Sequence, residues 1–243
     1  MNVSAILVIA DHPSSTEGSN DSALYEQGEP SRRPIVCAEL LGQSVLERTI
    51  VRLRQAGIRP ITVIGGPGLS SLPSNRDVHT IVAGNPFTRW PVAQRILKQQ
   101  SVQGIETVLM IGLGAYTEPN VPAALEFHRT RGMPLTQLED TQGPLDFWIV
   151  DAKWFTTAAT GRTLPFHYGE FPGLPIPFPM TGYVNRLAGA HDLRRLVADA
   201  LLLRCELKPR GREVRPGIWL DDDARVHKSS RLVAPVYLGR SPK

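Results

Sequence analysis

Short apolar runs alternate with segments of helical periodicity along most of the chain. The run AILVIA predicts a buried strand over residues 3–10. Further strands are expected in RPITVIGG, HTIVAG and ETVLMIG, and DFWIVDAKWF predicts a strand that enters a short helix. Strands that alternate with helices are typical of an α/β fold with a mostly parallel sheet covered on both faces.

The clearest helix signal covers residues 44–56. Ser44 and Glu47 form a capping-box pattern, apolar residues at helical spacing follow, and Gly57 stands at the end. Three more helices are expected near residues 91–100, in PNVPAALEFHRTRG and in HDLRRLVADALLLR. His128, in the second of these segments, is expected at the helix surface or its boundary.

Two segments interrupt this alternation. Residues 11–34 are polar and predict a long loop after the first strand. Residues 164–180 contain five prolines, so this segment is expected to be extended and cannot be a central strand. GGPG at residues 65–68 lacks a following Lys-Ser or Lys-Thr pair, which favours a strand-to-helix turn over an anion-binding loop.

The C-terminal part of the chain has a different period. Aliphatic residues recur at every sixth position, and small or aliphatic residues precede four of them by two positions. The two sets are Val214, Leu220, Val226, Leu232 and Leu238, and Ile218, Ala224, Ser230 and Val236. This period is that of hexapeptide β-helix repeats. The sequence therefore predicts an α/β domain over residues 1–212 and a short left-handed β-helix stub over residues 213–243.

Composition and charge narrow the class of protein. The net charge is +4, but Lys and Arg are interspersed with Asp and Glu, so no basic stripe predicts nucleic-acid binding. No apolar stretch approaches the length of a membrane span, and the first residues do not resemble a signal peptide. The two cysteines, Cys37 and Cys205, are far apart and suit reduced thiols. We expect a cytoplasmic protein with neither a membrane nor a nucleic-acid partner.

Four segments carry a family resemblance: RRPIVCAELLGQSVLERTIVRLRQAGIRPITVIGG, VLMIGLGAYTEPNVPAALEFHRTRGMPLT, TGYVNRLAGAHDL and PGIWLDDDARVHKSSRLVAPVYLG. Together with the order of the two predicted domains, they resemble the sugar-1-phosphate nucleotidyltransferases, especially the mannose-1-phosphate guanylyltransferase type. The resemblance implies a Rossmann-like nucleotidyltransferase domain. It also implies the conversion of a nucleoside triphosphate and a sugar 1-phosphate to a nucleoside-diphosphate sugar and diphosphate.

The resemblance also shows where this chain departs from the family. The family's phosphate-binding loop, GxGTRLxPLTxxxPKP, is replaced by DHPSSTEGSND after the first strand. Arg33 stands at the Lys of PKP, so Arg32 and Arg33 are the candidate phosphate-binding residues. Gly114 and Arg186 stand at the two aspartates that hold Mg²⁺ in the family.

The segment between Thr136 and Phe147 is also too short for the family's sugar-binding insert with its Glu-Lys-Pro. These departures predict a catalytically impaired paralogue with a regulatory or structural role, and no cofactor is expected. The paralogue would bind a nucleotide or nucleotide-sugar. Residues 213–243 would associate with a second copy or with an intact homologue, because a short repeat array leaves its terminal coil open.

Two other functions remain open from the sequence. The chain could be an active nucleotidyltransferase that uses Mg²⁺ at a rebuilt site with Asp11, Asp21 or Glu118. It could also be a nucleotide-sugar-dependent glycosyltransferase with Asp221 and Asp223 as its metal motif, although a solvated turn is the expected structure of that segment. Among the six histidines, only His12 lies in the expected active-site loop.

Overall fold

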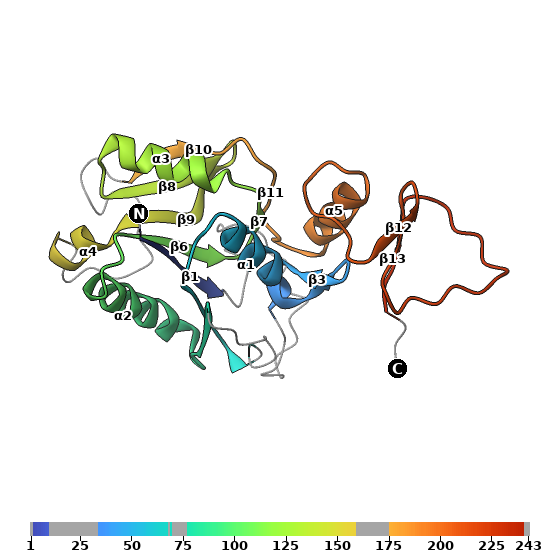
Figure 1. The fold of residues 1–243 in the computed structure, drawn as a ribbon, viewed down its shortest axis with the longest axis horizontal. Helices are drawn as coiled ribbons and strands as arrows, with labels where there is room; N and C mark the ends of the chain where they lie inside the picture. Colours follow the sequence, from blue (N-terminus) through green and yellow to red (C-terminus); the bar gives the residue numbers. More distant parts are fainter. Residues whose placement is uncertain (1, 10–33, 68, 70–76, 159–174, 241–243) are drawn as a thin grey trace, which may run out of the picture.

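The structure, a computed structural model, describes residues 2–9, 34–67, 69, 77–158 and 175–240. A seven-stranded sheet lies at its centre, in the order β10-β8-β9-β6-β1-β4-β5 (Figure 1). β9 is antiparallel to both of its neighbours, and the other pairs are parallel. The strands are β1 (Val3–Ile9), β4 (Ile61–Gly65), β5 (Val78–Val82), β6 (Thr107–Leu113), β8 (Leu135–Asp140), β9 (Gly143–Asp151) and β10 (Ile176–Pro179). The mostly parallel sheet predicted from the sequence is confirmed.

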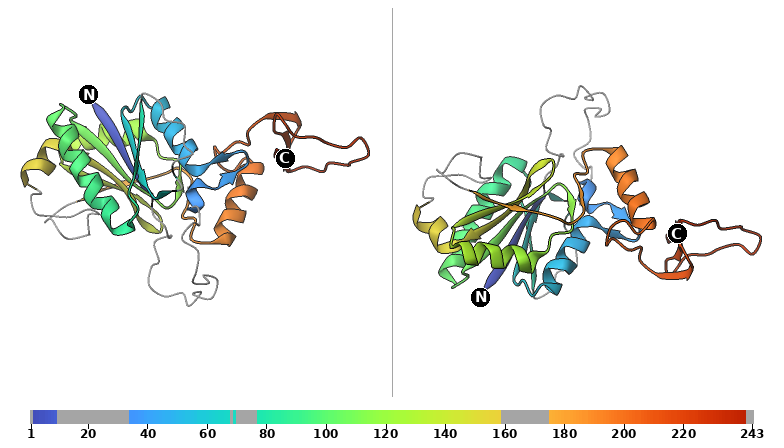
Figure 2. Two further views of the ribbon diagram at one scale, coloured as in Figure 1. Left: turned by 90° about the horizontal axis from the view of Figure 1, so that it is seen from below. Right: turned by 90° about the horizontal axis from the view of Figure 1, so that it is seen from above.

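Helices cover both faces of this sheet, as expected (Figure 2). The helices are α1 (Val45–Gln55), α2 (Arg89–Val102), α3 (Val121–Arg131), α4 (Ala152–Ala158) and α5 (Ala190–Leu201), with short 3₁₀ turns η2 (Ile35–Cys37) and η4 (Pro86–Thr88). α1, α3 and α5 contribute to one hydrophobic core, and α2 and α4 contribute to the other. Successive residues of β1 enter different cores: Leu7 enters the first, whereas Ile6 and Val8 enter the second. This alternation is the reason why the strand is apolar at every position.

The predicted helix ends are realised in detail. Ser44 is the N-cap of α1, where its Oγ accepts from the Glu47 backbone N–H at 3.1 Å and Glu47 accepts from the Ser44 backbone N–H at 2.7 Å. α3 has Pro122 in its first turn and ends at Gly132, whose φ of 59° lies in the left-handed region. α2 begins at Arg89, slightly before its predicted start.

Strand β8 was not predicted from the sequence. β8 and β9 form a hairpin joined only by Thr141 and Gln142, so the connection is as short as expected. The described end of the proline-rich segment forms β10 at the edge of the sheet, where Pro177 and Pro179 are exposed. An edge strand tolerates proline because one side of it needs no backbone donor.

His128 lies elsewhere than expected. It is 4% exposed, and its Nδ1 lies 2.8 Å from the Thr136 hydroxyl of β8. Burial lowers the pKa of the imidazole. The prediction of a surface or boundary position was wrong because α3 turns this side chain onto the sheet, where Thr136 supplies a polar partner.

Three small sheets complete the fold. β2 (Glu39–Leu40) pairs with β3 (Gln43–Ser44), and β7 (Tyr116–Thr117) pairs antiparallel with β11 (Val184–Asn185). β12 (Arg212–Arg215), β13 (Ile218–Leu220) and β14 (Val236–Leu238) form the third sheet. We call residues 212–240 the arm, because they project from the α/β body in Figures 1 and 2.

The arm carries one feature of the predicted repeat. β13 and β14 are parallel, and Ile218 pairs with Val236, which lies eighteen residues later, as one coil of three six-residue sides requires. β12 is instead antiparallel to β13, and two of the expected inward residues, Val214 and Val226, are 41% and 37% exposed. The left-handed β-helix and the domain boundary at residue 212 therefore stay predictions. No helix within the described ranges is long and apolar enough to span a membrane.

Candidate functional site

A cavity opens at the carboxyl end of β6. In the sheet order, β1 leads to β4 and β5 on one side, whereas β6 lies on the other side. The carboxyl ends of β1 and β6 thus form the switch point at which open α/β sheets bind ligands. The lining residues come from α1, from β6 and the residues after it, from the start of β9 and from the segment after β11. They include Thr49, Arg52, Gly112, Gly114, Asp146 and Arg186.

Two glycines shape the cavity wall differently. A Cβ on Gly112 would lie 2.8 Å from the Cβ of Asp146 and 3.3 Å from the Trp90 ring, so only glycine allows Asp146 to lie against β6. Among the described residues, nothing lies within 4 Å of the position that a Cβ on Gly114 would take. A larger residue at position 114, including aspartate, would therefore fit without a steric clash.

Arg186 is held by the β8–β9 hairpin. Its Nη2 donates to Asp140 Oδ1 at 2.6 Å and to the Gly143 carbonyl at 3.1 Å, and its Nη1 donates to the Pro144 carbonyl at 3.2 Å. The Asp140 side chain is 11% exposed and that of Arg186 is 34% exposed. The guanidinium thus links the β8–β9 hairpin to the segment that follows β11.

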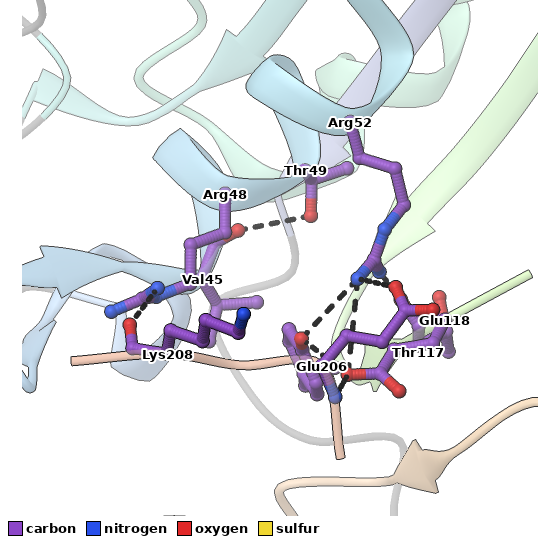
Figure 3. A network of polar contacts seen from close by, with 9 residues as sticks. Val45, Arg48, Thr49, Arg52, Thr117, Glu118, Glu206 and Lys208 are labelled. Carbon is purple, nitrogen blue, oxygen red and sulfur yellow. Dashed lines mark hydrogen bonds and ion pairs between the residues drawn. The ribbon is translucent and has the colours of Figure 1, made fainter. Parts of the chain in front are cut away.

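Arg52 is the centre of a second polar network (Figure 3). It donates to the Thr117 carbonyl and to Glu206 Oε2, the latter at 3.1 Å, and it forms an ion pair of 3.8 Å with Glu118. Glu118, whose side chain is 6% exposed, also accepts at Oε1 from the Tyr116 hydroxyl and from the Glu206 backbone N–H, both at 2.7 Å. Burial and this contact with Glu118 raise the pKa of the Tyr116 hydroxyl.

The same face of α1 holds the segment that leads to the arm. Arg48 donates to the Lys208 carbonyl at 2.8 Å and to the Leu40 carbonyl at 3.1 Å. Thr49 donates back to the Val45 carbonyl at 2.9 Å, so its hydroxyl is used within the helix (Figure 3). α1 therefore connects the cavity to residues 206–208, directly before the arm.

Asp146 differs from the other charged residues of the cavity. Within the described part of the chain it forms no hydrogen bond or ion pair. The residue as a whole is exposed, and it lines the cavity. Partial desolvation by the surrounding protein raises the pKa of Asp146, and the charge of Arg186 acts in the opposite direction.

The structure brings Gly114 and Arg186 together in one cavity, because β7 pairs with β11 between them. Arg32 and Arg33 lie outside the described residues, as do Asp11, Asp21 and His12. Glu118 is occupied by its hydrogen bonds and ion pair.

Asp221 is not part of a fully solvated turn, contrary to expectation. Its side chain is 0% exposed, accepts from the Tyr237 hydroxyl at 3.1 Å and lies 3.7 Å from Arg240. Asp222 and Asp223 are exposed. The expectation was wrong for Asp221 because the β13–β14 pairing brings Tyr237 over it, so Asp221 and Asp223 face different environments.

Within the described ranges, no group of three or more His, Cys, Asp or Glu side chains is placed to hold a metal ion. Sequence reasoning missed Asp146, Asp140 and Arg52. Asp146 directly precedes the apolar run of β9, and this position is the one signal that could have placed it at a strand end.

Comparisons with known proteins identify the fold. No family model matches the chain, and no curated protein matches it. Two solved structures share its architecture: HddC from Yersinia pseudotuberculosis in complex with GMP-PN, and a candidate glucose-1-phosphate thymidylyltransferase from Bacillus anthracis in complex with a sucrose. The TM-score is 0.56 for both, at 13% and 14% identity, over 82% and 85% of this chain and 99% and 96% of theirs. The chain has the nucleotidyltransferase fold.

A third neighbour, Rv0371C from Mycobacterium tuberculosis in complex with manganese, has a TM-score of 0.50 at 12% identity. It covers 82% of this chain and 99% of its own. At these identities the comparisons establish the Rossmann-like nucleotidyltransferase fold.

Replacing Glu118 tests the network around Arg52. Glu118→Ala is expected to lower the free energy of unfolding by about 2–3 kcal/mol, because it removes the buried carboxylate that pairs with Arg52 and accepts from the Tyr116 hydroxyl. Glu118→Gln keeps an acceptor oxygen and should lose less. Urea denaturation measures both.

Glu126→Ala is the matched control, because the Glu126–Arg129 pair is exposed on α3. This control should leave the urea midpoint nearly unchanged. Equal midpoints for Glu118→Ala and Glu126→Ala would mean that the network contributes nothing to stability.

Proposed function

We propose that the protein is a sugar-1-phosphate nucleotidyltransferase-like paralogue with little or no catalytic activity. Its role would be regulatory or structural, in cytoplasmic nucleotide-sugar or polysaccharide metabolism. The observation that supports this proposal is the position of Arg186, whose guanidinium lines the cavity and is paired at 2.6 Å with Asp140. By the resemblance, this position would carry a metal-binding aspartate.

The residues of the cavity do not suit Mg²⁺ in the family's manner. In nucleotidyl transfer the metal bridges the phosphates and stabilises the charge that develops in the transition state. At the two positions where carboxylates would hold it, Gly114 has no ligand atom in its side chain and Arg186 carries a positive charge that repels a cation. We therefore derive no metal-dependent step for this chain.

The active alternatives have weaker support. Glu118, one candidate for a rebuilt metal site, is engaged by Arg52, Tyr116 and Glu206. The glycosyltransferase alternative needs Asp221 as an open ligand, but that side chain is buried beneath Tyr237.

We propose that the protein still binds a ligand although its catalytic activity is lost. The neighbouring structures hold GMP-PN in one case and sucrose in another, and the cavity lies at the switch point of the sheet. We propose that a nucleotide or nucleotide-sugar binds at this edge, with Arg32 and Arg33 as its phosphate-binding residues.

Nucleotide binding should be nearly independent of Mg²⁺. In calorimetric titrations with GTP and dTTP, the dissociation constants with Mg²⁺ and with a chelator should agree within about threefold. A large gain in affinity with Mg²⁺ would contradict the proposal.

The double variant Gly114→Asp with Arg186→Asp provides the positive control. An aspartate fits at position 114, and the second change removes the repelling cation. This variant should gain a thermal stabilisation by Mn²⁺ or Mg²⁺ that the parent lacks.

Replacing both Arg32 and Arg33 with Ala should weaken nucleotide binding by about tenfold or more, because two charge-assisted contacts to phosphate are lost. Arg225→Ala with Arg231→Ala removes the same charge from exposed positions of the arm and serves as the control. An unchanged affinity in the first variant, measured by the same titration, would move the phosphate site elsewhere.

We further propose that residues 213–243 mediate association with a second copy or with an intact homologue. Val233 of the arm is 69% exposed, and short repeat arrays bury their apolar faces only by stacking on another unit.

Light scattering should show a dimer or larger, and a variant that ends at Arg212 should be monomeric with an unchanged circular dichroism spectrum of the α/β body.

Val233→Asp tests the same association without shortening the chain, because it places a charge on the most exposed apolar residue of the arm. A parent protein that is monomeric at tens of micromolar, from which pull-down recovers no homologue, would refute the association.

A further inference from the structure

Helix α5 has a second apolar face besides the one that is buried in the core. Leu196 and Ala200 are fully buried there. Neighbouring positions of the helix line a groove together with Leu40 of β2 and Pro235 of the arm. We call it the α5 groove, and its helix residues are Leu193, Arg194, Val197, Ala198, Leu201 and Leu202.

The α5 groove offers an apolar surface on which another chain can pack. Leu193, Val197 and Leu201 follow one another at four-residue spacing, so they form a row along the helix. Ala198 and Leu202 form a second row beside it, and both are exposed. Burial of such a surface against a second apolar surface is favourable, by about 25 cal/mol for each Å² removed from water.

The arm carries an exposed apolar residue of its own. Val233 is 69% exposed, and it is not among the described residues that line the α5 groove of its own chain. The loop that holds it, between β13 and β14, extends away from α5 and from the rest of the body (Figures 1 and 2). A loop that points away from its own body is placed to contact a second molecule.

The exposed charges of the two surfaces are complementary. Arg194 is the one polar side chain among the described residues of the groove, and Glu39 belongs to β2, which also supplies a lining residue. The arm presents Asp222 and Asp223 near the start of its loop and Arg231 near the end. All five side chains are exposed, and within the described ranges none of them forms an ion pair or a side-chain hydrogen bond. Each surface therefore offers charges that the other can pair.

The α5 helix of a second copy is a less suitable occupant of the groove. Arg194 would then need an acidic partner on the facing helix. The two carboxylates of α5 are already engaged within their own chain, Asp192 by Arg195 at 3.3 Å and Asp199 by Arg204 at 3.3 Å. The arm brings exposed carboxylates instead.

We propose that the α5 groove is the docking site for the arm of a second copy of this chain. Val233 of one copy packs on the apolar rows of α5 in the other, and Asp222 and Asp223 pair with Arg194. The exchange is reciprocal, so a two-fold axis makes the contact twice. This inference rests on the proposed association through residues 213–243, for which it names the docking surface and commits to a second copy as the partner.

Ala198→Glu tests the groove. The side chain at position 198 is exposed, so the α/β body should fold and keep its circular dichroism spectrum. The new carboxylate fills the space between the two apolar rows and repels Asp222 and Asp223. Sedimentation equilibrium should show that the dissociation constant of the dimer rises about tenfold or more. Ala123→Glu, the same change at an exposed position of α3, is the matched control and should leave the dimer unchanged.

Charge reversal tests the partner. Arg194→Asp alone should weaken the dimer, and so should Asp222→Arg with Asp223→Arg. The combination of all three changes should restore most of the lost affinity, because each new charge then meets its opposite in the other copy. A groove that receives a different partner predicts no such recovery.

Three outcomes would overturn the inference. In the first, Ala198→Glu dimerises as tightly as the parent. In the second, the triple variant is no tighter than Arg194→Asp alone. In the third, Ala198→Glu abolishes a dimer that persists when the chain ends at Arg212, which would make α5 of the second copy the occupant.

Failure of the proposed function is distinguishable from these outcomes. A parent protein that is monomeric refutes the association itself. A parent dimer that is lost on truncation at Arg212 but kept in Ala198→Glu leaves the association standing and refutes the groove alone. The nucleotide titrations test the rest of the proposed function and do not depend on the dimer.

Discussion

The pairing of β1 with β6 in the middle of the sheet is the constraint from which the rest of the arrangement follows. Both strands are buried on both faces, so two layers of helices have to cover them, and both layers are present. With both faces covered, the strand ends are the natural place for a ligand site, and at β1 and β6 the order of the sheet changes direction. The cavity lies at the carboxyl end of this pair.

The chemistry of the cavity is set by which side chains the loops deliver there. In this chain a hairpin with a two-residue turn brings Asp140 against Arg186, and Asp146 lies over Gly112. Among the described residues, no cluster of metal-binding side chains is placed to hold the metal ion that nucleotidyl transfer uses. The nucleotidyltransferase fold thus surrounds a cavity whose two arginines are paired with carboxylates of the chain.

The polar networks on α1 link this cavity to the segment that leads into the arm. Arg52 and Arg48 bind Glu206 and Lys208 from adjacent turns of one helix, and the arm begins a few residues later (Figure 3). Glu206 is largely exposed at its side chain, whereas Glu118 is buried. The buried half of the network therefore supplies most of its stability, because exposed ion pairs contribute little.

The sequence by itself determined the local structure. Apolar runs and helix signals such as Ser44 with Glu47 and Gly132 depend on neighbouring residues only, so the order of most strands and helices and the α/β class followed from them. The short β8–β9 connection was also visible in the sequence, although strand β8 itself was not, because its outer residues are polar.

Only the tertiary structure decided the site. The pairings of Arg186 with Asp140 and of Arg52 with Glu206, and the burial of His128 and Asp221, join residues that the strand order and the strand pairings bring together. Asp146 is one acidic residue among many in the sequence, and it lines the cavity only because β9 runs beside Gly112. Charge balance and burial are properties of the space around a side chain, and the identity of that side chain does not fix them.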